Sequence, residues 1–456
     1  MNKRILIVGY GNAGRTLGAD VTARGGTVVG YLDDNVASGE VLGTLSDVNS
    51  VIRQHGVELL YFAIPSVDAG TVRNFINTVE SDSVEFAIVP RTYDIIVKDT
   101  VRIDDLTDVD VLDLVGRQPV RSNQLSSREF IKGKRIMVTG AAGSIGSHLV
   151  KQLAGMEPEH ILCVDWWENG TFFLGQDLGA RTNIDYRIAD VKNRPLMESL
   201  FAQFTPDIVF HAAAYKHVPL MQANPIEAFN NNVWGSLNLM RLAIDHGVSN
   251  FVYVSTDKAV NPVNVMGATK RIGEMLLLSI APGSVRTKFN AVRFGNVIES
   301  NGSVMQIFRN QIARKSALTV THPDVTRFFM TIDEAGHLII QSTLLGKDSE
   351  IFVLDMGEPV KILDLAKSLV RAVDPSLQID ITGLRPGEKM FEELSYEPDT
   401  VDSTSNEKIF VVRDSDLSVG QEFLAEIETL LKATLAYEMT GEELVAKLRT
   451  FGFAIQ

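Results

Sequence analysis

The sequence predicts an α/β protein with two doubly wound parallel sheets in tandem, because one local pattern occurs twice. Each copy is an apolar strand, a glycine-rich turn, a helix, a second apolar strand and then an acidic residue. The turns are GYGNAG at residues 9–14 and GAAGSIG at residues 140–146. This order of elements is the Rossmann-like dinucleotide fingerprint in its proper context.

Composition limits the class of protein. The 456 residues are enough for two or three domains, and 45% hydrophobic with 22% charged residues is ordinary globular composition. The net charge of −14 argues against nucleic-acid and membrane-surface partners. The N-terminus lacks a signal peptide and no apolar run is long enough to span a bilayer. We therefore expect a soluble, cytoplasmic enzyme with no nucleic-acid partner and no membrane span in this chain.

Metal and disulfide chemistry are not expected. Cys163 is the single cysteine, so no intramolecular disulfide can form. The eight histidines are scattered and include no HExxH motif. We predict no metal site.

The first domain is expected at residues 1–116. Strands are predicted at Arg4 to Val8 and Val28 to Leu32, the second ending in Asp33-Asp34. Two interpretations of Gly9, Gly11 and Gly14 remain open: a nucleotide site, or a regulatory or assembly domain whose glycines serve helix–strand packing. Residues 117–134 are polar and broken, which indicates a linker.

The second domain is expected at residues 135–456 and carries the stronger fingerprint. Gly140, Gly143 and Gly146 let the backbone approach a pyrophosphate, and Ser144-Ile145 open a helix whose N–H groups can bind it. Asp165 ends the next strand and can accept hydrogen bonds from both adenosine ribose hydroxyls. Its charge would repel a 2′-phosphate, so NAD is favoured over NADP.

Further cofactor contacts are expected along the same sheet edge. Asp190 and Val191 follow the next strand and are assigned to the adenine pocket, and the small residues Ala212, Ala213 and Ala214 allow close approach of the cofactor. Asn232, in the run 230–232, either hydrogen-bonds within the site or belongs to a helix N-cap cluster.

A candidate acid/base site follows the apolar run Phe251 to Val254. Thr256, Asp257 and Lys258 fall at the carboxyl end of this predicted strand, where open α/β sheets bind ligands. Met266 and Lys270 are four residues apart, so they share one face of the next helix. The alternative for Asp257-Lys258 is a solvated surface ion pair.

The last third contains polar loops with arginines. Arg327 and Arg385 are candidates for binding a diphosphate, because a guanidinium matches phosphate geometry; the alternative is surface ion pairing. Residues 418–453 have helical periodicity without chemical groups and are expected to pack on the outside.

These motifs resemble a known family. The segments concerned are Val138 to Ser147, Ala212 to Pro219, Ser255 to Lys270, Arg293 to Val297 and Arg385 to Lys389. They are similar to extended short-chain dehydrogenases acting on nucleotide sugars, and more narrowly to UDP-N-acetylglucosamine 4,6-dehydratases of bacterial polysaccharide biosynthesis. The resemblance covers residues 117–396 and implies a small C-terminal substrate subdomain, with substrate elements mainly in 290–400. Members usually associate, so a homo-oligomer is expected.

The N-terminal unit also looks like the extra Rossmann-like domain of the family's long members, which usually carry transmembrane helices ahead of it. By that resemblance the chain is either a soluble form or the cytoplasmic part of a membrane-anchored protein.

The resemblance assigns roles residue by residue. The glycines and Asp165 fall on NAD positions, and Lys270 on the lysine that holds the nicotinamide ribose. Thr256, Asp257 and Lys258 fall on the catalytic trio. The substrate positions, including the UDP group, are Lys216, Asn232, Asn296, Arg327, Arg385 and Glu388. One departure is Met266, where most short-chain dehydrogenases have tyrosine.

The implied reaction is oxidation at C4 of the sugar, loss of water across C5 and C6, and return of the hydride to C6. Lys258 is expected to be the C5 base, Asp257 the acid at C6 and Thr256 a hydrogen-bond partner of the C4 oxygen. Because Met266 transfers no proton, Asp257 must also serve C4. Rival interpretations are a nucleotide-sugar 4-epimerase and a non-catalytic NAD- or nucleotide-sugar-sensing module.

Overall fold

The computed structural model describes residues 3–81, 83–89, 114–115, 124–281, 286–298, 300–346, 349–394, 401–412 and 420–456. Residues 117–123 of the predicted linker and 418–419 of the predicted C-terminal helical stretch lie outside this part. The chain divides into two compact units, and both are discontinuous in sequence. The first comprises Met1–Val120, Val304–Phe329 and Val360–Gly383; the second comprises Arg121–Ser303, Met330–Pro359 and Leu384–Gln456.

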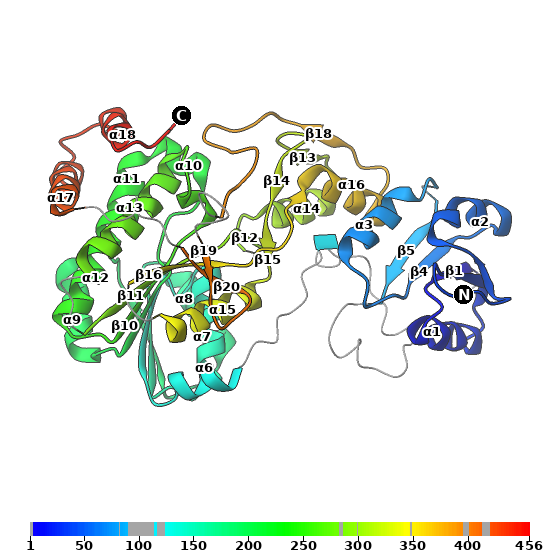
Figure 1. The fold of residues 1–456 in the computed structure, drawn as a ribbon, viewed down its shortest axis with the longest axis horizontal. Coiled ribbons are helices and arrows are strands. Elements are labelled where there is room, and N and C mark those ends of the chain that lie inside the picture. Colours follow the sequence, from blue (N-terminus) through cyan, green and yellow to red (C-terminus); the bar gives the residue numbers. More distant parts are fainter. Residues whose placement is uncertain are drawn as a thin grey trace. The chain divides into compact units, whose positions relative to one another are not determined.

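A five-stranded parallel sheet forms the centre of the first unit, in the order β3-β2-β1-β4-β5 (Figure 1). Its elements are β1 (Arg4–Val8), α1 (Asn12–Ala23), β2 (Thr27–Leu32), β3 (Val41–Gly43), η1 (Leu45–Asp47), α2 (Val48–His55), β4 (Leu59–Phe62), α3 (Ala69–Thr78) and β5 (Glu85–Ile88). The predicted fold class is confirmed for this unit, while the short strand β3 was not predicted.

The first glycine turn is tightly packed. A Cβ on Gly14 would lie 1.9 Å from the carbonyl oxygen of Gly9, so α1 can approach β1 only with glycine there. Asp33, at the end of β2, accepts a hydrogen bond from the N–H of Tyr10 at 2.7 Å. A Cβ on Gly11 would meet nothing within 4 Å. Gly9 and Gly14 therefore have the packing role that was one of the two interpretations.

Two later segments also belong to the first unit, against the expectation of one continuous domain from residue 135. They contribute α14 (Val304–Ala313), β13 (Leu318–Val320), β14 (Thr326–Arg327), β17 (Val360–Lys361), α16 (Ile362–Val373) and β18 (Ile379–Ile381). Helix α16 packs on α3: Arg371 Nη1 donates to the carbonyl oxygen of Asn77 at 2.5 Å, and Ser368 Oγ donates to Asn77 Oδ1 at 3.2 Å. Local periodicity does not reveal this pairing, because the partners are far apart in the sequence.

The second unit is built on a nine-stranded sheet in the order β19-β20-β16-β11-β10-β9-β6-β7-β8. The strands from β16 to β8 are parallel, and β20 and β19 add an antiparallel edge. The strands are β6 (Arg135–Thr139), β7 (His160–Asp165), β8 (Ile184–Ile188), β9 (Ile208–His211), β10 (Asn250–Val254), β11 (Lys288–Arg293), β16 (Glu350–Leu354), β19 (Val401–Ser403) and β20 (Ile409–Val412). Shorter strands are β12 (Asn296–Val297) and β15 (Phe329–Met330), the latter where the chain passes between units.

Helices cover both faces of this sheet. In Figure 1, α9, α12 and α13 lie together on one side, and α6, α7 and α15 pack together on the other. The helices are α6 (Gln124–Ile131), α7 (Ser144–Ala154), α8 (Glu168–Leu178), α9 (Arg194–Phe204), α10 (Val218–Ala223), α11 (Pro225–Phe229), α12 (Gly235–Asp245), α13 (Val265–Ile280), α15 (Ile332–Leu345), α17 (Gln421–Leu435) and α18 (Gly441–Thr450). The doubly wound architecture predicted for this unit is confirmed.

Helix α6 corrects the predicted linker. Residues 124–131, which were read as part of a broken connection, form a helix whose Ile131 and Ser127 are fully buried, and α6 packs on α15. The exposed face of α6 carries Ser126, Arg128 and Glu129, and these polar side chains make the segment resemble a linker in the sequence.

The C-terminal helices contribute to the main core of the second unit. Ile427, Leu430 and Leu444 belong to the same buried cluster as the strand residues Phe251 and Phe289. The two helices are therefore more deeply integrated than an outer layer. Among the described residues, no helix is both long and apolar enough to cross a membrane.

Candidate active site

The second glycine turn brings strand, helix and neighbouring loop into direct contact. Gly140 has a positive φ of 71°, and a Cβ there would lie 2.5 Å from the backbone nitrogen of Ala213. A Cβ on Gly146 would lie 2.0 Å from the carbonyl oxygen of Gly140. Gly143 is the N-cap of α7 and has no side-chain capping bond, so the first N–H groups of Ser144 and Ile145 face the turn. This is a backbone cradle for an anionic group.

Asp165 completes the cradle at the end of β7. It is 8% exposed, and its two carboxylate oxygens accept hydrogen bonds from the N–H groups of Ala142 and Trp167, each at 2.9 Å. These bonds fix the carboxylate beside the glycine turn, and each oxygen retains a lone pair for a hydroxyl group. These acceptor oxygens fit a dinucleotide with a free ribose diol, whose hydroxyl groups would donate to them.

The remaining predicted cofactor positions follow two other strands of the same sheet, β8 and β9. Ala212, Ala213 and Ala214 follow β9 directly, against Gly140. Asp190 Oδ1 accepts from the N–H of Lys192 at 2.8 Å, and Val191 is buried against Gly235 of α12.

Asn232 does not have the substrate-binding environment that was predicted. Its side-chain Nδ2 donates to the carbonyl oxygen of Tyr215 and to Thr269 Oγ1, each at 3.0 Å, and its Oδ1 accepts from the N–H of Tyr215 at 2.8 Å. The N-cap alternative is also wrong, because residues 230–234 form a π-helical turn (η3) inside a continuous helical run. Asn232 instead ties the loop after β9 to α13.

The predicted trio lies at the end of β10: Thr256 is the N-cap of the short 3₁₀ turn η4 (Asp257–Ala259), which contains Asp257 and Lys258. Thr256 Oγ1 donates to Asp257 Oδ1 at 2.7 Å and accepts from the N–H of Lys258 at 3.4 Å. Asp257 is fully buried, and its Oδ2 has no hydrogen-bond partner among the residues that the structure describes. A buried carboxylate oxygen without a partner is costly and marks a place for a ligand or a proton. The surface ion-pair interpretation of Asp257 is therefore wrong.

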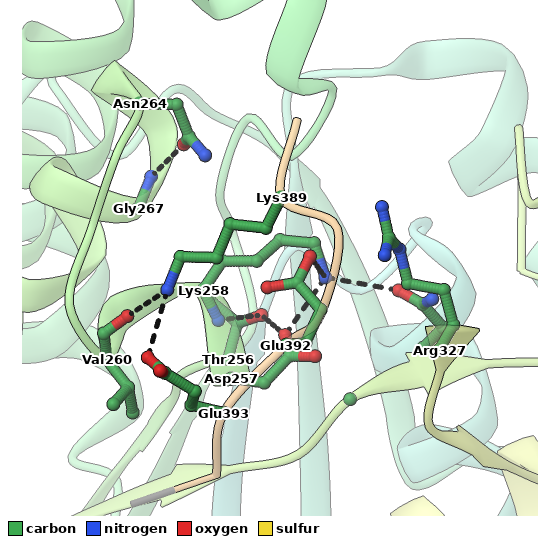
Figure 2. Close-up of polar contacts among 12 residues, drawn as sticks. Thr256, Asp257, Lys258, Val260, Asn264, Gly267, Arg327, Lys389, Glu392 and Glu393 are labelled. Atoms are coloured by element: carbon green, nitrogen blue, oxygen red, sulfur yellow. Dashed lines mark hydrogen bonds and ion pairs between the residues drawn. The ribbon is translucent and has the colours of Figure 1, made fainter. Parts of the chain in front are cut away.

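Lys258 points into a group of oxygen atoms (Figure 2). Its Nζ donates to Asp257 Oδ1 at 3.0 Å and to Asn296 Oδ1 at 3.2 Å, and it lies 3.5 Å from Glu392 Oε1. The Lys258 side chain retains 17% exposure, which leaves one side open to solvent or a ligand. Asn296, predicted to bind substrate, contacts Lys258.

The first turn of helix α13 packs against this site. Asn264 caps the helix by accepting from the N–H of Gly267 at 2.7 Å, and a Cβ on Gly267 would lie 2.2 Å from the carbonyl oxygen of Lys258. Met266 is 3% exposed and packs in the core. It offers no proton, in agreement with the prediction from its chemistry.

Lys270 is deeply buried on the same helix. Its Nζ lies 3.9 Å from the ring centroid of Tyr253, and burial lowers the pKa of Lys270 to about 7, with Glu274 acting in the opposite direction. Burial and the charge of Lys270 lower the pKa of His211 to about 3. That neutral imidazole is hydrogen-bonded to Thr139 and Ser236, each at 2.8 Å, so it joins β6 and β9 to α12.

The predicted substrate residues come from several segments of the chain. Lys216 follows β9, and desolvation of its ammonium, followed by the charge of Lys258, lowers its pKa. Arg385 is exposed in a loop where its N–H donates to Glu388 Oε2 at 3.2 Å, so Glu388 shapes the loop. Arg327 lies on β14 of the first unit, where its Nη1 donates to the carbonyl oxygen of Thr326 at 2.7 Å. The diphosphate role of the arginines remains a prediction.

With this geometry in place, a family model described as polysaccharide biosynthesis protein matches residues 136–414. The chain belongs to the polysaccharide biosynthesis protein family. The predicted resemblance to extended short-chain dehydrogenases of this family is confirmed. A second model, described as a CoA-binding domain, matches residues 1–90.

Three relatives show which proteins this chain is similar to. The probable polysaccharide biosynthesis protein EpsC of Bacillus subtilis is 38% identical over 98% of this chain and 78% of its own length. A UDP-N-acetylglucosamine 4,6-dehydratase (inverting) of Campylobacter jejuni is 32% identical over 63% of this chain and 87% of its own. A UDP-glucose 4-epimerase of Rickettsia bellii is 34% identical over 57% of this chain and 77% of its own.

A solved structure also matches this family member. The X-ray structure of Pen from Bacillus thuringiensis is 32% identical with a TM-score of 0.59, covering 64% of this chain and 91% of that chain.

Two groups of buried charged residues at the candidate active site were not predicted from the sequence. The first is a buried ion pair between Glu274 and Arg293, joined by Ser255, whose Oγ donates to Glu274 Oε1 at 2.6 Å. The second is Glu392, beside Lys258. Glu274 lies four residues after Lys270, so both are on the same face of the helix. This spacing is the sequence signal that could have identified Glu274 as a residue of interest. No local signal distinguishes Glu392 from its neighbour Glu393.

Proposed function

We propose that this chain is an NAD-dependent nucleotide-sugar 4,6-dehydratase that acts on UDP-N-acetylglucosamine. The observation that carries the proposal is the adjacent pair Asp257 and Lys258, an acid and a base held at 3.0 Å in a site where one Asp257 oxygen has no described partner. Dehydration across C5 and C6 needs a base for the C5 proton and an acid for the C6 hydroxyl. A 4-epimerase needs proton transfer at C4 alone.

The cofactor would be held by Gly140, Gly143, Gly146 and Asp165, with Lys270 at the nicotinamide ribose. The chemistry that NAD would supply when bound is reversible hydride transfer, from C4 and later to C6. The carboxylate of Asp165 disfavours a 2′-phosphate, which supports NAD over NADP.

The chain's own groups move the protons. Asp257 takes the C4 hydroxyl proton, with Thr256 Oγ1 hydrogen-bonding the C4 oxygen, and then gives that proton to the departing C6 hydroxyl. Lys258, as the neutral amine, takes the C5 proton and later returns it. Asp257 ends as a carboxylate and Lys258 as an amine, so the proton count closes in each cycle. The buried Met266 leaves Asp257 as the proton acceptor at C4.

A 4-epimerase is the alternative function, because the relatives include both dehydratases and epimerases. The Campylobacter relative is named a dehydratase and the Rickettsia relative an epimerase, so action on a nucleotide sugar has the broader support. The Asp257–Lys258 pair favours dehydration, because the second proton-transfer group has no use in epimerisation.

Incubation with UDP-N-acetylglucosamine, followed by mass spectrometry of the nucleotide sugar, tests the proposal. We expect loss of one water. An unchanged mass with altered stereochemistry at C4 would establish the epimerase instead. Absence of turnover with NAD bound to the protein would favour a sensing module.

A further inference from the structure

Glu392 is a buried carboxylate beside the base of the proposed reaction. Its side chain is 3% exposed, and its Oε1 lies 3.5 Å from Lys258 Nζ. With Asp257 and Asn296, it surrounds Nζ with three oxygen atoms, which matches the three N–H donors of an ammonium group. We propose that Glu392 is a positioning residue that holds Lys258 as the ammonium and thereby sets the pH at which the neutral amine becomes available. This inference rests on the role proposed for Lys258 as the C5 base.

The segment that carries Glu392 is attached at two other points to residues that follow the Lys258 turn. Asn264 Nδ2 donates to the carbonyl oxygen of Gly387 at 2.9 Å. Lys389 Nζ donates to the carbonyl oxygen of Val260 at 2.9 Å, as Figure 2 shows. Gly387 has a positive φ of 75°, and a Cβ there would lie 2.7 Å from Asn264 Cβ. The backbone therefore fixes the position of Glu392 independently of its contact with Lys258.

The charges around Lys258 act in opposite directions. Asp257 and Glu392 favour the ammonium, because an opposite charge within about 4–6 Å stabilises the charged form. Lys216 acts against it, as the coupling that lowers the pKa of Lys216 indicates. Lys389 lies in the same cluster, but its ammonium is engaged by Val260 and, at 3.3 Å, by Glu393. Of the two carboxylates at Lys258, Glu392 is the one without a proton-transfer step in the proposed reaction.

The adjacent Glu393 provides a matched control. Its side chain is 48% exposed and accepts hydrogen bonds from Asn261 Nδ2 at 3.0 Å and from Lys389. Glu392→Gln and Glu393→Gln therefore remove the same charge from neighbouring positions, but one of them removes it from Lys258.

Competitive labelling of the full-length protein tests the inference without depending on turnover. Acetic anhydride acylates neutral amines, and peptide mass spectrometry across a pH series gives the labelling midpoint of Lys258. We expect Glu392→Gln to move this midpoint to lower pH by about one unit, the size typical of losing one nearby opposite charge. Glu392→Asp, which withdraws the carboxylate by one methylene, should give a smaller shift in the same direction. Glu393→Gln should leave the midpoint at the wild-type value.

The second readout is exchange of the C5 proton of UDP-N-acetylglucosamine with deuterated solvent. When the exchange rate is plotted against pH, the acidic limb for Glu392→Gln should move to lower pH, as the labelling midpoint does. A midpoint that stays at the wild-type value, or rises, in both folded Glu392 variants would overturn the inference. A shifted midpoint in a protein that never dehydrates the sugar would support it while the proposed function fails.

Discussion

Arg293 donates two hydrogen bonds to Glu274, from Nε and Nη2 at 2.7 Å each, in a place where both side chains are completely buried. The pair joins the end of β11 to the middle of α13. The hydroxyl of Ser255, the residue that precedes the proposed trio, donates to Glu274. The trio is therefore linked through Ser255 to a buried charged pair.

Glu274→Gln should destabilise the protein by about 3–5 kcal/mol, because it leaves the buried Arg293 charge without its partner. Urea unfolding measures this change. Asp177→Asn, which breaks the exposed pair with Lys151, should cost less than about 1 kcal/mol. Equal losses of stability in Glu274→Gln and Asp177→Asn would contradict the prediction that breaking a buried ion pair costs more than breaking an exposed one.

The same pair predicts acid sensitivity. Burial acts to raise the pKa of Glu274, but the charge and hydrogen bonds of Arg293, the charge of Arg271 and the hydrogen bond from Ser255 together outweigh it, and the pKa is lowered from 4.5. A carboxylate with a lowered folded-state pKa contributes stability above its unfolded value and loses it as pH falls through the folded value. The free energy of unfolding of wild type should therefore exceed that of Glu274→Gln at neutral pH, and the difference should shrink below about pH 4.5.

Lys270 predicts a pH dependence of the same sign in a higher pH range. Its folded-state pKa of about 7 lies below the ordinary value of 10.5, so between these values the unfolded chain binds more protons. The free energy of unfolding of nucleotide-free protein should rise through this range, by at most about 1.4 kcal/mol per pH unit. Lys270→Met should remove that rise, whereas Lys447→Met, at an exposed position on α18, should keep it. Parallel pH profiles for wild type and Lys270→Met would show that Lys270 stays charged when buried.

What the sequence could predict depended on how local the signal was. The glycine turn with Asp165, and the trio with Lys270, are each contained in a short stretch of sequence. The structure holds Asp165 at the glycine turn, and it packs α13, the helix of Lys270, on the turn of the trio. Glu392 and the Glu274–Arg293 pair reach the site from separate elements, and only the folded chain identifies their partners. The domain division failed for the same reason: α16 packs on α3 through Asn77, a contact with no local signature. Asn232 was misassigned because an asparagine run looks the same whether its amides face a ligand or a backbone loop.

Gly267 should be required for a correctly placed Lys258. Gly267→Ala would put a Cβ 2.2 Å from the carbonyl oxygen of Lys258, and a backbone atom can yield only by moving the catalytic turn. We expect turnover to fall at least about tenfold and overpacking to cost about 1–3 kcal/mol. Gly175→Ala in α8 is the control, because its Cβ would meet Tyr186 at an ordinary 3.6 Å and alanine favours helix. Wild-type turnover in Gly267→Ala would show that the turn tolerates displacement.

Met266 should be replaceable by another apolar side chain of similar size. It is 3% exposed within the core cluster, and the proposed reaction gives it no proton to carry. Met266→Leu conserves volume and should cost less than about 1.5 kcal/mol of stability, with kcat within about threefold of wild type. Asp257→Asn, measured beside it, should lower kcat by about 10²–10⁴, because it removes the group proposed for proton transfer at both C4 and C6. A loss of that size in a folded Met266→Leu protein would mean that the thioether acts at the reacting sugar, and the proton route through Asp257 would have to be revised.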